Sequence, residues 1–200
     1  MLKRLVFRAG IGSDYGKNLR WALEKRFGET GRELFSRNHV MNEPSSLYAT
    51  RQSDTTDILH ECFIPGRRLA EFIAQSRPVL LRHHLELLNV TVRNVKQDDD
   101  TFLRYAPEEV FGLVLLFHQQ RDAASEAAMQ ALSRELIDVA LACEGRYYLP
   151  YRPHATSDQF VRAYPQAKAF FELKRRYDPQ GVFENQFFEN YGRALMAVGK

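Results

Sequence analysis

Between residues 57 and 151 the chain alternates strand-like and helix-like segments, and this order limits the folds open to it. Strands are predicted where apolar residues run together or alternate with polar ones, and helices where apolar residues recur every three or four positions. The clearest alternation is Leu-Asn-Val-Thr-Val-Arg at residues 88–93. The predicted strands are residues 57–65, 88–93, 110–119 and 146–151, and the predicted helices between them are residues 67–75 and 122–143.

The order strand, helix, strand, strand, helix, strand is the split βαβ plan. We therefore predict an α+β fold with a ferredoxin-like antiparallel sheet and helices on one face. Helical extensions are predicted at both ends, from Asp14 to about Phe27 and at residues 159–164 and 166–177. An antiparallel sheet covered on one face leaves the other free to meet water, a partner or a ligand.

Punctuating residues set the expected boundaries. A polar loop at residues 42–57 suggests three parts: an N-terminal helical or linker extension (1–53), the sheet domain (54–151) and a helical tail (152–200). Pro78 is expected to interrupt the first helix and Gly145 to end the second. The tail is predicted to pack on the sheet domain or on another domain, because it carries the aromatic residues Phe183, Phe187, Phe188 and Tyr191.

Composition excludes several classes of protein. No apolar run approaches the ~18 residues of a membrane span, and the N-terminus lacks the apolar core of a signal peptide. The two cysteines are too few for a disulfide framework, so we expect buried thiols and a cytoplasmic location. The six histidines lack metal-ligand spacing, so no metal site is predicted. The chain has a net charge of +3, and its excess of basic residues lies in residues 1–53. They are spread singly among aliphatic residues there, which favours a solvated, partner-facing segment over nucleic-acid binding.

Polar side chains are expected to gather on the uncovered face of the sheet. If the aliphatic residues of 88–93 face the helices, the polar ones face outward, and Glu61 and Tyr148 should share that face. Such a concave polar surface would suit a substrate. The alternative is a solvated face with a Glu–Arg cross-strand pair. The predicted substrate-binding residues are Asn89, Thr91, Arg93, Tyr151, Arg152 and His154.

Three strings late in the chain are familiar in their order and spacing. They are Gly-Arg-Tyr-Tyr-Leu-Pro-Tyr-Arg at 145–152, Gln-Phe-x-x-Ala-Tyr-Pro at 159–165 and Phe-Phe-x-x-Lys-Arg-Arg-Tyr-Asp-Pro-x-Gly-Val-Phe at 170–183. Together they resemble the C-terminal substrate (cap) domain of FAD-linked oxidases of the vanillyl-alcohol oxidase and p-cresol methylhydroxylase superfamily. That superfamily includes aldonolactone oxidases and cytokinin dehydrogenases. The resemblance covers roughly residues 57–191.

This resemblance implies a cap domain whose sheet covers the flavin of a separate FAD-binding domain or subunit, with substrate between them. An alcohol or sugar-like substrate would transfer hydride to the flavin. Glu61 or Tyr148 would be the catalytic base, and Arg93 would hold a substrate oxygen. Asn185 would contact the cofactor.

The glycine-rich loops that bind FAD are missing from this sequence. Residues 10–16 lack the third glycine of the dinucleotide fingerprint, because Tyr15 stands there, and are interpreted as a turn. We therefore expect a cap domain without its FAD-binding domain, which would be a shortened chain, a subunit of a split enzyme or a remnant. Alone, such a chain should be inactive and should not bind FAD tightly. Self-association into a homo-oligomer would cover its exposed apolar surface. The alternative function is a non-enzymatic ferredoxin-like module that binds a ligand or partner.

Overall fold

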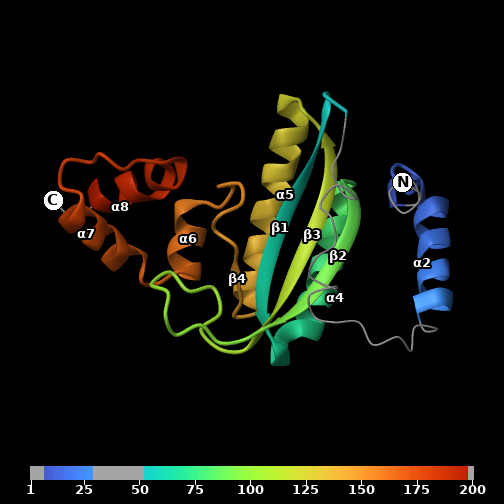
Figure 1. Cartoon of the computed structure of the whole chain (residues 1–200), viewed down its shortest axis with the longest axis horizontal. Coiled ribbons are helices and arrows are strands. Elements are labelled where there is room, and N and C mark those ends of the chain that lie inside the picture. The colour runs from blue at the N-terminus through green and yellow to red at the C-terminus, as the bar shows by residue number, and fades with distance from the viewer. Residues whose placement is uncertain (1–6, 29–51, 198–200) are drawn as a thin grey trace.

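The protein is described here by a computed structural model, which covers residues 7–28 and 52–197. Its centre is a four-stranded antiparallel sheet in the order β2-β3-β1-β4 (Figure 1). The strands are β1 (Thr55–Pro65), β2 (Glu86–Val95), β3 (Val110–Gln120) and β4 (Arg146–Tyr147). The helices are α2 (Asp14–Gly28), η2 (Gly66–Arg68), α4 (Leu69–His83), α5 (Ala123–Ala142), α6 (Ser157–Ala163), α7 (Ala167–Tyr177), the π-helical turn η3 (Phe188–Gly192) and α8 (Arg193–Ala197).

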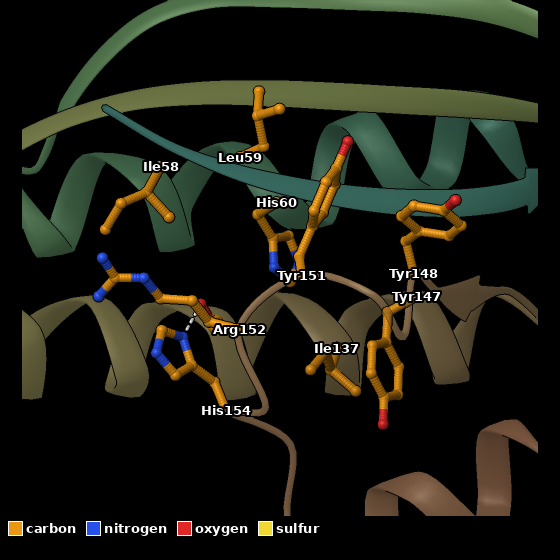
Figure 2. Close-up of a pocket in the computed structure, with 10 residues that line it drawn as sticks. Ile58, Leu59, His60, Ile137, Tyr147, Tyr148, Tyr151, Arg152 and His154 are labelled. Atoms are coloured by element: carbon orange, nitrogen blue, oxygen red, sulfur yellow. Dashed lines mark hydrogen bonds between the residues drawn. The ribbon is translucent and has the colours of Figure 1, made fainter. Parts of the chain in front are cut away.

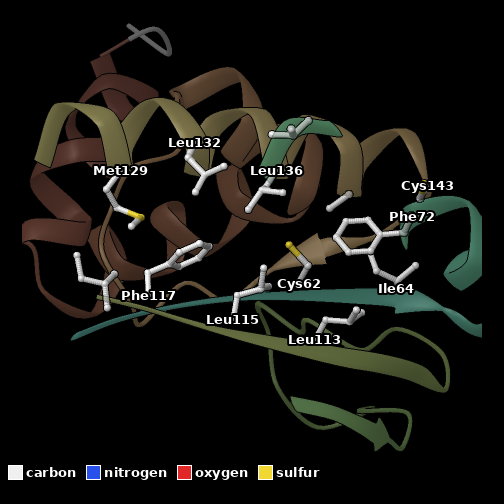
Figure 3. Packing of buried hydrophobic residues seen from close by; sticks show 13 residues of the cluster. Cys62, Ile64, Phe72, Leu113, Leu115, Phe117, Met129, Leu132, Leu136 and Cys143 are labelled. Atoms are coloured by element: carbon white, nitrogen blue, oxygen red, sulfur yellow. The ribbon is translucent and has the colours of Figure 1, made fainter. Parts of the chain in front are cut away.

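The predicted α+β fold is confirmed, and so is the order of its elements. Helices α4 and α5 pack together and cover one face of the sheet, and an apolar core fills the space between (Figure 3). Burial of each large side chain in this core contributes roughly 1.5–3 kcal/mol. The largest are Ile64, Phe72, Phe117, Met129, Leu132 and Leu136.

Helix α5 shows how the sequence sets an element. Asp122 precedes its first turn, and the Asp122 carboxylate accepts a hydrogen bond from the backbone N–H of Ser125 at 2.8 Å. Such a cap satisfies one of the donors that a helix start leaves free. One face of α5 carries the buried residues Met129, Leu132, Leu136 and Ala140, which point at the sheet.

The prediction that Pro78 would interrupt the first helix is wrong. Helix α4 runs from Leu69 to His83 with Pro78 inside it. Pro78 is exposed, so its ring lies on the solvent side, while Phe72 and Val79 anchor the helix in the core on either side of it. Tertiary packing therefore outweighs the loss of one helical hydrogen bond.

The expectations for Gly145 and for the last strand also need correction. Helix α5 ends at Ala142, and the residue in the left-handed conformation after it is Glu144 (φ 59°), not Gly145. Gly145 is needed for space, because a Cβ there would lie 2.5 Å from the side chain of Ile64. The strand predicted over 146–151 pairs only as Arg146–Tyr147. Beyond it Tyr148 still donates its N–H to the carbonyl of Glu61 (3.0 Å), and Pro150 has no N–H to continue the ladder.

The C-terminal tail packs on α5 and β4. Its aromatic side chains form a second core cluster that includes Ile137 of α5 and Tyr147 of β4. Helix α6 begins with a capping box between Thr156 and Gln159. The tail residues of this cluster include Phe160, Tyr164, Phe171, Phe187, Phe188 and Tyr191. Phe183 departs from the prediction, because it is 79% exposed.

The N-terminal segment lies on the side of the sheet that α4 and α5 leave free (Figure 1). Arg8 binds Asp57 of β1, Lys17 binds Glu86 of β2 at 2.7 Å, and Arg20 of α2 donates to the side-chain oxygen of Asn89 at 3.2 Å. The predicted helix at residues 14–27 is confirmed. Most of the predicted polar loop at residues 42–57 lies outside the described residues. None of the helices in the described part combines the length and apolar character of a membrane span.

Candidate active site

The strand register places one set of side chains on the free face of the sheet. Cys62 and Ile64 of β1 point into the core under the helices, so Glu61 and Phe63 point the other way. Two rows cross this face from β2 through β3 to β1. The first is Thr91, Val114 and Glu61, and the second is Arg93, Gly112 and Phe63. The free face thus brings a carboxylate and a guanidinium from two non-neighbouring strands into adjacent rows.

Glu61 is the most unusual residue on this face, because its acidic side chain is only 5% exposed. Its carboxylate accepts a long hydrogen bond from the Tyr151 hydroxyl, at 3.5 Å. Burial raises the pKa of Glu61, while the charge of Arg93 and the bond from Tyr151 oppose that rise. A carboxyl group with a raised pKa and little compensation is a typical candidate for proton transfer.

Four aromatic rings surround this carboxylate on one side. Phe63 and Tyr105 are stacked with centroids 4.2 Å apart, and Tyr148 meets both edge-on. Tyr151 meets Tyr148 edge-on at 5.0 Å. Tyr105 comes from the loop between β2 and β3, and its pKa is raised by burial and by the neighbouring Tyr148. The rings form an apolar wall next to the Glu61–Arg93 pair, as ligand sites require.

Arg152 and His154 are not on this face, contrary to the expectation that they would lie just beyond Tyr151. Figure 2 shows both beside α5, on the helix side of β1. Nδ1 of His154 is 3.0 Å from the Ser133 hydroxyl, and its Nε2 is 2.8 Å from Oε1 of Glu126. Arg152 binds the same Glu126. This network fastens the segment after β4 to α5, so the geometry gives Arg152 and His154 a structural role.

Three other predicted positions already have partners. Asn89 accepts from Arg20 and donates to Thr91 at 3.1 Å, so α2 covers this end of β2. Asn185, predicted to contact the cofactor, uses its side-chain oxygen to accept the N–H of Phe188 at 2.8 Å, as a helix cap. Glu61, Arg93, Tyr148 and Tyr151 are therefore the predicted residues that the structure brings together.

The buried groups behind the sheet are poor candidates for catalysis. His60 lies 3.4 Å from the sulfur of Cys62, and burial lowers the pKa of His60 to about 4, with a further contribution from His154. Burial raises the pKa of Cys62, so its thiol stays protonated and inert. Both cysteines are free and buried, as predicted. Among residues 7–28 and 52–197, no cluster of His, Cys, Asp and Glu suits a metal ion.

The glycines near the N-terminus do not fit the pyrophosphate of a dinucleotide. A Cβ at Gly16 would lie 2.7 Å from the carbonyl oxygen of Ala9 and 3.1 Å from Cα of Gly10. Gly16 therefore allows a close contact between two backbone segments, as in the predicted turn, and does not open a space for a phosphate group. In the part of the chain that the structure describes, the free face of the sheet could contact a substrate or a flavin ring, but the glycines do not form a site for the rest of FAD.

Sequence reasoning missed Phe63, Tyr105 and Gly112. Gly112 carried a signal, because an isolated glycine in a strand often marks a close approach. Phe63 was hidden among the apolar residues of its strand, although strand alternation puts it on the same face as Glu61. Tyr105 had no signal, since it belongs to a loop.

A protein-family model matches most of this chain. The model described as D-arabinono-1,4-lactone oxidase matches residues 29–191, most of the chain, and begins directly after α2. The matched range contains the whole sheet and the group of residues around Glu61 on its free face. We call this group the Glu61 cluster; its members are Glu61, Phe63, Arg93, Tyr105, Tyr148 and Tyr151. None of the curated proteins compared with the chain matches it.

Proposed function

The chain belongs to the D-arabinono-1,4-lactone oxidase family of FAD-linked oxidases, and on this basis we propose that it is the substrate-binding cap domain of such an enzyme. FAD would be held by a separate FAD-binding domain or subunit, because the described glycines fit no pyrophosphate. The substrate would be a lactone or a related sugar-like alcohol. The site would be the Glu61 cluster on the free face of the sheet.

The observation that carries this proposal is the buried Glu61 carboxylate near Arg93 on an otherwise uncovered sheet face. A carboxylate buried for stability alone would be expected to have strong partners, as Asp57 has in Arg8 and His118. Among the residues that the structure describes, the partners of Glu61 are the hydroxyl of Tyr151, at 3.5 Å, and the charge of Arg93. Weak partners leave its oxygens ready to accept a hydrogen bond from a ligand.

The residues of this chain would divide the chemistry among them. FAD, when bound, supplies the acceptor for a hydride from the substrate carbon. Glu61 would accept the proton of the substrate hydroxyl, since its raised pKa brings it closer to neutral pH. Arg93 would stabilise negative charge that develops on the substrate oxygen. The rings of Phe63, Tyr105 and Tyr148 would exclude water and contact the apolar face of a sugar ring.

The first test is to purify the tagged chain from its own source cells and record the visible spectrum. We expect a yellow flavin spectrum, carried by the same polypeptide or by a second one, that bleaches on addition of a sugar lactone or alditol. A colourless preparation without a second polypeptide would contradict the proposal and would favour the non-enzymatic binding module.

The second test uses the flavin-containing preparation. Arg93→Ala is expected to reduce the rate of flavin bleaching by about 10²–10³-fold, as loss of a donor to a developing oxyanion does. The matched control is Arg77→Ala, because Arg77 is exposed on α4, which covers the opposite face. Equal rates in the two variants would contradict the assignment of the site.

A further inference from the structure

Glu61 and Arg93 lie on strands that are not neighbours, and β3 runs between them. They also occupy different rows of the free face, since Arg93 is opposite Gly112 and Glu61 is opposite Val114. Any side chain at position 112 would stand next to Arg93 and diagonal to Glu61. The residue at position 112 of β3 therefore determines how closely the two charged groups can approach one another.

The Glu61 carboxylate leans toward Gly112 instead of standing over its own row. A Cβ at position 112 would lie 3.2 Å from Oε1 of Glu61 and 3.3 Å from the ring of Phe63. Both distances are shorter than ordinary van der Waals contact, so neither group would keep its place above a larger residue. The carboxylate thus uses space that only glycine leaves open, and it lies on the side of Arg93.

The backbone does not explain this glycine. Gly112 is not among the residues with positive φ, and it lies inside β3, the third residue of a strand whose other positions are mostly apolar. Glycine weakens a strand interior, because it has no side chain to pack and loses more entropy on folding. We therefore attribute the glycine at position 112 to the space above it, which the Glu61 carboxylate and the ring of Phe63 approach.

We propose that Gly112 is a positioning residue, whose missing side chain lets the Glu61 carboxylate and the Arg93 guanidinium reach across β3 to the same substrate group. This inference deepens the proposed function and rests on it in one respect, that a substrate binds between Glu61 and Arg93. The geometry itself belongs to the described chain and requires no flavin. A competing, purely structural role is that Gly112 makes room only for the ring of Phe63.

The test is a set of NMR titrations of the chain labelled with ¹³C at the glutamate carboxyls, with the Glu61 signal identified by Glu61→Gln. In the native chain, Arg93→Gln is expected to raise the pKa of Glu61 by roughly 0.3–1 pH unit, less than for a contact pair, because Arg93 is exposed. In Gly112→Val the same Arg93→Gln change should have less than half this effect. Valine favours strands, so the fold should tolerate it.

Phe63→Leu is the matched control for the structural alternative. It removes the ring over Gly112 but leaves the gap between Glu61 and Arg93, so the effect of Arg93→Gln should persist. If Gly112→Val failed to fold, Gly112→Ala would replace it, since its Cβ alone meets Oε1 at 3.2 Å. An unchanged effect of Arg93→Gln in the folded Gly112 variant would overturn the inference, as would its loss in Phe63→Leu. Absence of flavin chemistry would overturn the proposed function and leave these titrations unaffected.

Discussion

Two carboxylates on the same face of β1 have opposite surroundings. Asp57, at one end of the strand, binds Arg8 and lies 2.6 Å from Nδ1 of His118. These partners outweigh the effect of burial and lower its pKa. Four residues further along β1, Glu61 has the long bond from Tyr151 and the charge of Arg93 as its partners among the described residues, and burial raises its pKa.

Under the proposed function, this difference separates an end of the sheet face that holds the fold together from an end that binds substrate. At the Asp57 end, residues from the N-terminal segment cover the strands and neutralise their charges. At the Glu61 end, burial raises the pKa of the carboxyl group, and the described residues offer it a long bond from Tyr151 and the charge of Arg93. Loss of one partner from a buried ion pair destabilises a protein, because a charge is left buried alone, whereas a buried carboxyl group with weak partners is a candidate for a functional site.

The largest difference between the two carboxylates should appear in the catalytic rate when each is replaced by its amide. Glu61→Gln keeps the shape but cannot accept a proton, so we expect the rate of flavin bleaching to fall about 10²–10⁴-fold. Asp57→Asn should leave that rate within a few fold. The measurement is stopped-flow reduction of the flavin-containing preparation at saturating lactone. Equal losses in both variants would show that the two ends do not differ in function.

For stability we expect the reverse order, with a larger loss on substitution of Asp57 than of Glu61. Asp57→Ala removes charged hydrogen bonds from Arg8 and His118, and is expected to lower the free energy of unfolding by roughly 1.5–3 kcal/mol at neutral pH. Since the folded pKa of Asp57 is below its ordinary 3.8, this contribution is present above that pH and is lost as pH falls through the folded value. Urea titrations of both proteins at several pH values would measure it. A loss that stayed constant down to the acid limit would contradict the ionic explanation.

Much of this comparison could be predicted from sequence, but not all of it. Strand alternation placed Glu61 and Arg93 on one face, because side chains in a strand alternate strictly. It could not place His154, whose position depends on where β4 stops and how the following segment meets Ser133. The different states of Asp57 and Glu61 were also out of reach, since Arg8 lies 49 positions before Asp57 in the chain. Contacts of that range follow from packing, not from local pattern.

The buried Glu61 should itself reduce stability at neutral pH. Its folded pKa lies above the ordinary 4.5, so the cost appears as pH rises from 4.5 through the folded value and is absent below it. Glu61→Gln is therefore expected to stabilise the protein at neutral pH by about 1 kcal/mol, the low end of the cost of burying a poorly bonded polar group. The same urea titrations would detect it. Destabilisation by Glu61→Gln at neutral pH would mean that Glu61 is a compensated structural residue like Asp57.

The smallest effect should come from the hydrogen bond that the Tyr151 hydroxyl donates to Glu61. At 3.5 Å the bond from Tyr151 is at the outer limit of hydrogen-bond geometry, so it contributes little. Tyr151→Phe keeps the edge-on contact with Tyr148 and should change the free energy of unfolding by less than about 0.5 kcal/mol. It should also raise the pKa of Glu61 slightly, because that bond favours the charged carboxylate. A loss above about 1.5 kcal/mol, the upper range for an ordinary hydrogen bond, would show that Tyr151 is a strong partner and that the two ends of the face are built alike.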